Sequence, residues 1–142
     1  MMSFHEKSRW IALVANLLVW GWYFLAVLGA VRSGVPDTPY LLAMLIPVII
    51  GLIFIHIVGH TVAAIMKPDE ANSAMDEREA AIRNRASARA YELLSFGLVI
   101  VLGASLYYWN TFIAVNGVLF VFVLAESVRY IIEIAAYRRG LA

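Results

Sequence analysis

The chain contains no cysteine among its 142 residues, so disulfide bonds and thiolate metal sites are excluded. Charged residues are also scarce: they make up 15% of the sequence, whereas soluble domains contain roughly a quarter. Hydrophobic residues make up 63%, and the mean hydropathy is +0.80. This balance indicates an integral membrane protein, for which the net charge of +1 matters less than the places where the charges lie.

Sequence patterns that usually carry catalysis are missing as well. The chain has no nucleophile–base pair and no glycine-rich loop of the kind that cradles a phosphate. We therefore expect that the protein is not an enzyme. We also expect it to contact the lipid bilayer and to bind no nucleic acid directly.

Long apolar runs dominate the chain, and four of them are long enough to cross a hydrocarbon core of ~30 Å as helices. The expected spans are residues 10–31, 40–66, 91–108 and 112–136. The first run exceeds the roughly 7–15 apolar residues of a secretory signal, which favours a retained span. Because proline removes a backbone hydrogen bond, Pro47 should kink the second span. We expect an all-α integral membrane four-helix bundle that forms a single domain over residues 1–142.

A polar segment over about residues 73–90 separates the two apolar halves. Its residues favour a helix, and Ser73 or Asn72 is suited to cap the helix start. No helix breaker stands between Ser73 and Trp109, so we expect one helix of ~55 Å that crosses the membrane and projects beyond it. Residues 109–111 should then form a tight turn into the last span.

The distribution of basic residues predicts the orientation through the positive-inside rule. Only Arg32 falls on one side of the membrane, and Arg129 lies within a span. The other side holds Lys7, Arg9, Lys67, Arg78, Arg83, Arg85, Arg89, Arg138 and Arg139. We therefore predict that both termini and the polar segment are cytoplasmic, and that the chain is a multi-pass protein of the bacterial inner membrane.

Several polar and ionisable side chains fall inside the expected spans. Such groups cost ~2.5–3.5 kcal/mol each at membrane depth, so they normally face the interior of a bundle. His56 and His60 stand four apart and share one helix face. His56 and Glu126 each lie about ten residues from the cytoplasmic end of their spans, ~15 Å deep. We predict one polar cluster on the cytoplasmic side of the bundle, formed by Asn16, His56, His60, Ser95, Glu126, Arg129 and Glu133.

Three roles for this cluster remain open. Its members can satisfy one another and hold the helices in register, as interhelical polar contacts do. A contact of His56 or His60 with Glu126 would make the cluster sensitive to protonation, as in a dimeric small transporter or a proton-linked channel. The same three residues are candidate ligands for zinc or copper, as in a metal- or haem-binding accessory subunit of a membrane complex.

The polar segment also has more than one interpretation. It can be a solvated extension of the helix or a docking surface for a cytoplasmic protein. The candidate docking residues are Asp76, Glu77, Arg78, Glu79 and Arg83. A third interpretation places Arg83, Arg85 and Arg89 against anionic lipid headgroups. On the second span, Gly59 and Ala63 are small enough to let helices approach closely, within one chain or in a homodimer.

The run Asp76-Glu77-Arg78-Glu79-Ala80-Ala81-Ile82-Arg83, followed by a span and a tight turn, resembles a motif of small bacterial four-helix membrane proteins. That family shares a D-E-R-[ED]-x-x-I-x-x-[RK]-like motif and is classed as a domain of unknown function. Its members are often encoded beside a small helix-turn-helix regulator, so the resemblance implies a membrane-bound control partner. Our leading hypothesis is a non-enzymatic, regulatory inner-membrane protein whose cytoplasmic helix binds a protein such as a transcription regulator.

Overall fold

The computed structural model describes residues 4–34, 38–66 and 76–139, and every regular element in this part of the chain is an α-helix. The helices are α1 (Phe4–Arg32), α2 (Thr38–Met66), α4 (Glu77–Tyr108) and α5 (Thr111–Arg139). Each contains a stretch long and apolar enough to cross a membrane. The predicted all-α membrane fold is confirmed, and each expected span lies inside one of these helices. α2 continues on both sides of Pro47.

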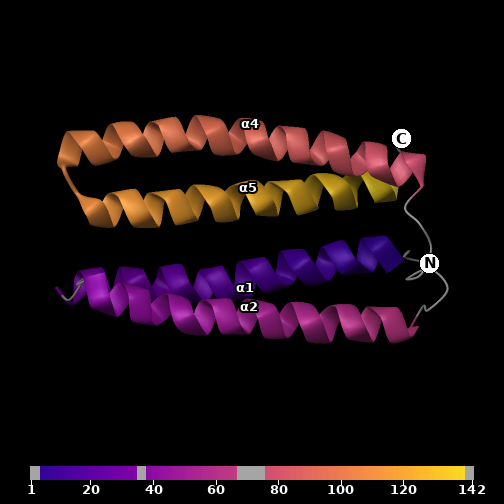
Figure 1. Ribbon diagram of the computed structural model, residues 1–142, viewed down its shortest axis with the longest axis horizontal. Helices are drawn as coiled ribbons and strands as arrows, with labels where there is room; N and C mark the ends of the chain where they lie inside the picture. The colour runs from indigo at the N-terminus through magenta and orange to yellow at the C-terminus, as the bar shows by residue number, and fades with distance from the viewer. Residues whose placement is uncertain (1–3, 35–37, 67–75, 140–142) are drawn as a thin grey trace. The chain divides into compact units, whose positions relative to one another are not determined.

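The four helices group into two compact units, Met1–Ser73 and Ala74–Ala142. In the first unit, α1 and α2 lie side by side and antiparallel, and we call this pair the N-terminal hairpin (Figure 1). In the second unit, α4 and α5 are paired in the same way as the C-terminal hairpin (Figure 1). The closed end of each hairpin is the end where its two helices are connected. We call the opposite end the open end.

The α1–α2 contact is close because glycines on α2 face branched side chains on α1. A Cβ atom added at Gly59 would lie 2.5 Å from Cγ2 of Ile11, and one added at Gly51 would lie 3.9 Å from the methyl groups of Val19. Ala63, one turn beyond Gly59, is buried. These small residues therefore permit close packing within the chain, and the register they set brings the start of α1 beside the end of α2.

Glycines also set the register of the C-terminal hairpin. Gly97 on α4 lies directly against the side chain of Val121 on α5. Further toward the closed end, a Cβ atom added at Gly117 on α5 would lie 2.9 Å from Cγ1 of Val101 on α4. Because the helices are antiparallel, equal numbers of residues counted away from these contacts remain level. The register therefore fixes which polar residues of α4 and α5 lie at the same height.

α4 begins at Glu77, and Asp76 is its N-cap. The Asp76 carboxylate accepts a hydrogen bond from the backbone N–H of Glu79 at 2.7 Å, and the Glu79 carboxylate accepts one from the backbone N–H of Asp76 at 3.4 Å. This capping box satisfies two backbone donors, so α4 is capped by Asp76 and not by the predicted Asn72 or Ser73. Those two residues lie outside the described part. The helix runs for 32 residues, ~48 Å.

The connection between α4 and α5 is a tight turn, as predicted for residues 109–111. Trp109 ends α4 in the left-handed region, with φ 48° and ψ 44°. The side-chain oxygen of Asn110 accepts hydrogen bonds from the backbone N–H groups of Phe112 and Ile113, at 2.9 and 3.3 Å. Asn110 therefore caps the start of α5, and the chain reverses direction within a very short connection.

Candidate functional site

Three side chains form a hydrogen-bonded chain near the open end of the N-terminal hairpin. Oγ of Ser8 on α1 lies 3.2 Å from Nδ1 of His60 on α2, and Nε2 of His60 lies 3.4 Å from Nδ1 of His56. The two imidazole rings are stacked, with centroids 5.6 Å apart and 19° between their planes. Both histidines are half-buried. We call Ser8, His60 and His56 the histidine chain.

The histidine chain has two complementary hydrogen-bonding patterns. In the first, Ser8 donates to Nδ1 of His60, and Nε2–H of His60 donates to Nδ1 of His56. In the second, Nδ1–H of His56 donates to Nε2 of His60, and Nδ1–H of His60 donates to Ser8. Both patterns use neutral imidazoles, because each ring donates at one nitrogen and accepts at the other. The arrangement can therefore transfer a proton without any movement of the helices.

The same geometry bears on the metal hypothesis. Both ring nitrogens of His60 take part in hydrogen bonds, so a metal bound at His60 would displace one of its partners. Within residues 4–34, 38–66 and 76–139, no three His, Asp or Glu side chains are grouped so as to hold a metal ion. Glu126, the third candidate ligand, belongs to the C-terminal hairpin. Its contact with His56 or His60 joins the two hairpins and stays a prediction.

Arg129 on α5 stands between two carboxylates. Its guanidinium donates a hydrogen bond to Glu126, and its Nη1 lies 3.8 Å from Oε1 of Glu133. The guanidinium also lies 4.7 Å from the ring centroid of Tyr130 and donates to the Tyr130 hydroxyl at 3.2 Å. The Glu133 side chain is fully buried, whereas 22% of Arg129 and 27% of Glu126 are exposed. We call these four residues the Arg129 cluster, in which one positive charge faces two carboxyl groups.

A second ion pair lies at the same height on α4. By the register of the hairpin, Arg89 is level with Arg129 and Glu92 is level with Glu126. Nη1 of Arg89 lies 2.9 Å from Oε2 of Glu92, and both side chains are exposed. At 1.5 Å per residue, these four groups lie ~23–29 Å from the closed end, compared with a hydrocarbon core of ~30 Å.

The closed end of the C-terminal hairpin carries a group of exposed aromatic side chains: Tyr107, Tyr108 and Trp109. Aromatic residues of this kind are enriched at membrane–water interfaces. If this end lies at one boundary of the hydrocarbon core, the ionic groups of α4 and α5 lie close to the other boundary. A charge at that height costs much less than one at the membrane centre, because its head can reach the interface.

Asn16 and Ser95, the other two residues predicted for the polar cluster, lie further from the open ends. Asn16 is buried on α1, eight residues or ~12 Å beyond Ser8. Ser95 is half-buried on α4, six residues or ~9 Å beyond Arg89. The cluster therefore consists of separate groups within each hairpin, and its assembly into one site across the hairpins stays a prediction.

Two residues of these groups were not identified from the sequence. Ser8 lies in the polar lead before the first span, and only the α1–α2 register brings it to His60. Tyr130 follows Arg129 directly, and adjacent helical residues do not normally face each other. The contact arises because the long guanidinium side chain reaches the neighbouring ring. The sequence signal that could have been used is an aromatic ring beside an arginine, which permits a cation–π contact.

The start of α4 presents side chains of both charges. The five predicted docking residues lie here, and all are exposed except for the half-buried Glu79: Asp76, Glu77, Arg78, Glu79 and Arg83. We call them the α4 docking surface. The other side of this segment is buried at Ile82, Ala86 and Ala90. Because one side is packed and the first turn is capped, the charged side chains project from a backbone held in place.

A family model described as a predicted membrane protein, DUF2178, matches residues 5–141. The chain belongs to the DUF2178 family. This match extends over all four helices, whereas the resemblance seen in the sequence rests mainly on residues 76–83 and the span that follows. No curated protein and no solved structure matches the chain. As a DUF2178 protein, it is a membrane protein with four spans that sits in a lipid bilayer, from a family of unknown function.

Proposed function

We propose that this DUF2178 protein is a non-enzymatic, regulatory protein of the bacterial inner membrane, and that the α4 docking surface binds a cytoplasmic protein such as a transcription regulator. The observation that carries the proposal is the capping box of Asp76 and Glu79, which holds a charged and exposed helix start in place. A surface that is ordered before binding loses less entropy when a partner arrives. Charges of both signs favour one orientation of that partner over others.

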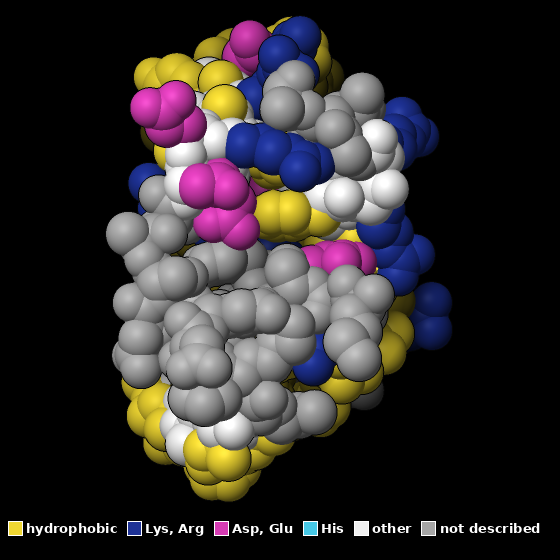
Figure 2. Space-filling model, turned by 90° about the vertical axis from the view of Figure 1, so that its right-hand side faces the viewer, with side chains coloured by type: hydrophobic (Ala, Val, Ile, Leu, Met, Phe, Trp, Pro, Cys, Tyr) yellow, Lys and Arg dark blue, Asp and Glu magenta, His cyan; other side chains and the backbone are white. Residues whose placement is uncertain are grey.

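The distribution of charge in the C-terminal hairpin supports a cytoplasmic position for this surface. Residues 93–125, on both sides of the closed end, contain no charged side chain. The basic residues lie toward the open end: Arg78, Arg83, Arg85, Arg89, Arg129, Arg138 and Arg139. Figure 2 looks onto this end, where Lys and Arg side chains in dark blue lie among acidic side chains in magenta. The positive-inside rule favours an open end that faces the cytoplasm.

Charge reversal on the docking surface tests the proposal without disturbing the cap. In the double variant R78E/R83E, Asp76 and Glu79 are unchanged, so α4 should start at the same residue. We expect the full-length variant, purified from native membranes, to retain about tenfold less of the partner protein than the wild type retains, because repulsion replaces two attractive contacts. The control is Arg32→Glu, a charge reversal at the closed end of the other hairpin. If R78E/R83E retains the partner at the wild-type level, docking does not occur at this surface.

The histidine chain supports a second candidate function, a proton-linked transporter or channel. In this mechanism Ser8 passes its hydroxyl proton to Nδ1 of His60 as its oxygen takes up a proton from a hydronium ion in the adjacent solution, which becomes water. His60 passes its Nε2 proton to Nδ1 of His56, and His56 releases the proton held at its own Nε2. The transfer converts the first hydrogen-bonding pattern into the second, and rotation of the rings or a reverse proton transfer restores it.

A flux measurement separates this candidate from the first. Wild-type protein in liposomes that contain a pH-sensitive dye should let protons follow an imposed gradient, and His60→Phe should reduce the flux to that of empty liposomes. Ser33→Ala is a suitable control, because the Ser33 hydroxyl donates to the Gly29 carbonyl oxygen of α1, at the exposed closed end. Equal flux through the wild type and His60→Phe would exclude the histidine chain as the path.

A further inference from the structure

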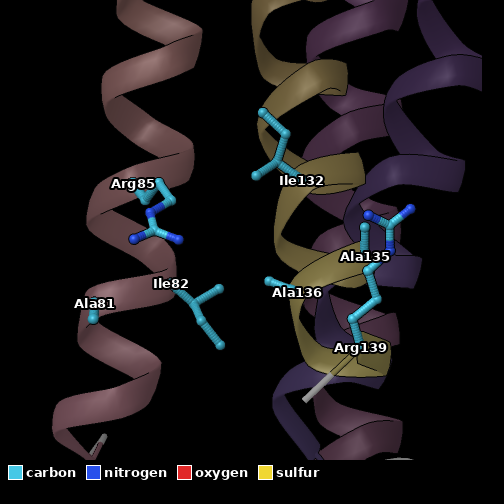
Figure 3. A pocket seen from close by; sticks show the side chains of 7 residues that line it. All are labelled: Ala81, Ile82, Arg85, Ile132, Ala135, Ala136 and Arg139. Carbon is cyan, nitrogen blue, oxygen red and sulfur yellow. The ribbon is translucent and has the colours of Figure 1, made fainter. Parts of the chain in front are cut away.

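A cavity of about 260 Å³ lies between α4 and α5 at the open end of the C-terminal hairpin. Its apolar lining consists of Ala81, Ile82, Ile132, Ala135 and Ala136. Figure 3 shows Ile82 extending from α4 toward α5. Arg85 on α4 and Arg139 on α5 complete the lining (Figure 3). The cavity therefore combines an apolar lining with one guanidinium group on each of its two helices.

The positive charges of these two arginines are not neutralised within the described part of the chain. Arg85 and Arg139 form no hydrogen bond or ion pair with any residue among 4–34, 38–66 and 76–139. Arg89 and Arg129, in contrast, have carboxylate partners. Glu133 is level with Arg85 on α5, but it pairs with Arg129. The cavity therefore presents two positive charges that remain available to a ligand.

The height of the cavity matches the lipid headgroup region. Counted along the helices from the closed end, Ile132 lies at ~32 Å, Arg85 at ~35 Å and Arg139 at ~42 Å. A hydrocarbon core is ~30 Å thick, and the two headgroup layers together bring the bilayer to ~40–45 Å, so each layer adds ~5–8 Å. With the aromatic closed end at one boundary of the core, Ile132 lies at the other boundary and Arg85 lies at the level of the phosphate groups. Arg139 begins beyond that level, and its side chain extends back toward the membrane to the height of Ala135, at ~36 Å (Figure 3).

We infer that this cavity binds an anionic phospholipid of the bilayer. The lipid phosphate lies against Arg85 and Arg139, whose planar donors suit phosphate oxygens, and the first carbons of an acyl chain lie against Ile132 at the edge of the core. Basic pockets on the cytoplasmic side of transmembrane helices are known to hold anionic headgroups. An acidic peptide accounts for the charge alone, whereas a lipid also accounts for the heights of Ile132 and Arg85, which lie at the core boundary and at the level of the phosphate groups. None of the lining residues belongs to the α4 docking surface, so this inference goes beyond the proposed function.

Native mass spectrometry of the full-length protein in a nonionic detergent tests this site. Wild-type protein is mixed with equal amounts of phosphatidylglycerol and phosphatidylcholine, and the ratio of the two lipid-bound species is measured. We expect the wild type to favour phosphatidylglycerol and R85Q/R139Q to lose about tenfold or more of that preference. Ala136→Phe fills the cavity without changing its charge, and it should reduce binding of both lipids. Circular dichroism checks that each variant keeps its helices.

The matched control is R78Q/R83Q, which also removes two positive charges from the open end of this hairpin but leaves the cavity lining intact. It should keep the wild-type lipid preference. If R78Q/R83Q loses the preference for phosphatidylglycerol to the same extent, the preference comes from a general attraction of basic residues to anionic lipid, and the inference is wrong. An unchanged preference in R85Q/R139Q would overturn the inference. A third result would also overturn it: the protein shows no lipid preference but retains an acidic apolar peptide, and this retention is lost in R85Q/R139Q. The occupant of the cavity would then be a protein segment.

Discussion

Arg129 makes several polar contacts on α5. It hydrogen-bonds Glu126, lies near Glu133 and stacks over Tyr130. The Glu133 side chain has no exposed surface, so its charge depends on a neighbouring cation more than that of the part-exposed Glu126 does. Loss of one partner from a buried ion pair is strongly destabilising, because the remaining charge stays buried.

We therefore predict that Arg129→Ala lowers the free energy of unfolding by roughly 3 kcal/mol. The matched control is Arg89→Ala, at the same height on α4. Arg89 pairs with Glu92, but their side chains are 67% and 64% exposed, so its loss should cost less than about 1 kcal/mol. Thermal unfolding in detergent, followed by circular dichroism, measures both. Similar losses for the two variants would show that the Arg129 cluster is no more important than a surface ion pair.

At the scale of the helices, the close contact between α4 and α5 depends on glycine. Gly97 lies directly against Val121, so the helices can touch there only if no side chain is present on α4. Gly103, six residues nearer the closed end on the same helix, has nothing within 4 Å of the position of an added Cβ atom. The two glycines therefore form a matched pair in which only one is required for helix packing.

Gly97→Val should destabilise the C-terminal hairpin by about 1–3 kcal/mol, because the helices must separate to accommodate the methyl groups. Gly103→Val introduces the same β-branched residue with the same helix propensity and should have little effect. Comparison of their melting temperatures in detergent separates packing from propensity. Equal melting temperatures would mean that the register inferred from Gly97 and Val121 is not the one that the protein adopts.

The helices themselves were predictable from the sequence, because span length and hydropathy are local properties. The sequence predicts an earlier start for α4 than the observed Glu77, since Asn72, Ser73 and Asp76 are all suitable cap residues and only the pairing of Asp76 with Glu79 selects Asp76. Contacts between helices are harder to predict from the sequence. Ser8 meets His60 across 52 positions of sequence, and helical periodicity gives the face of each residue but not the height of its partner on another helix.

For the molecule as a whole, charged residues are distributed unevenly between the two ends of each hairpin. In the N-terminal hairpin, Lys7 and Arg9 lie at the open end and Arg32 lies at the closed end. In the C-terminal hairpin, all the charged residues lie toward the open end. Family membership establishes a membrane protein with four spans. The proposal adds that the open ends face the cytoplasm, which the docking surface and the lipid cavity both require.

The absence of cysteine allows this orientation to be measured directly. Single cysteines at Glu77, at the start of α4, and at Tyr108, at the closed end, can each be exposed to a maleimide reagent that does not cross membranes. We predict that Glu77→Cys is labelled only in inside-out membrane vesicles, and that Tyr108→Cys is labelled only in right-side-out vesicles. The opposite pattern, or a Glu77→Cys that is protected in both preparations, would contradict a charged helix start that projects into the cytoplasm.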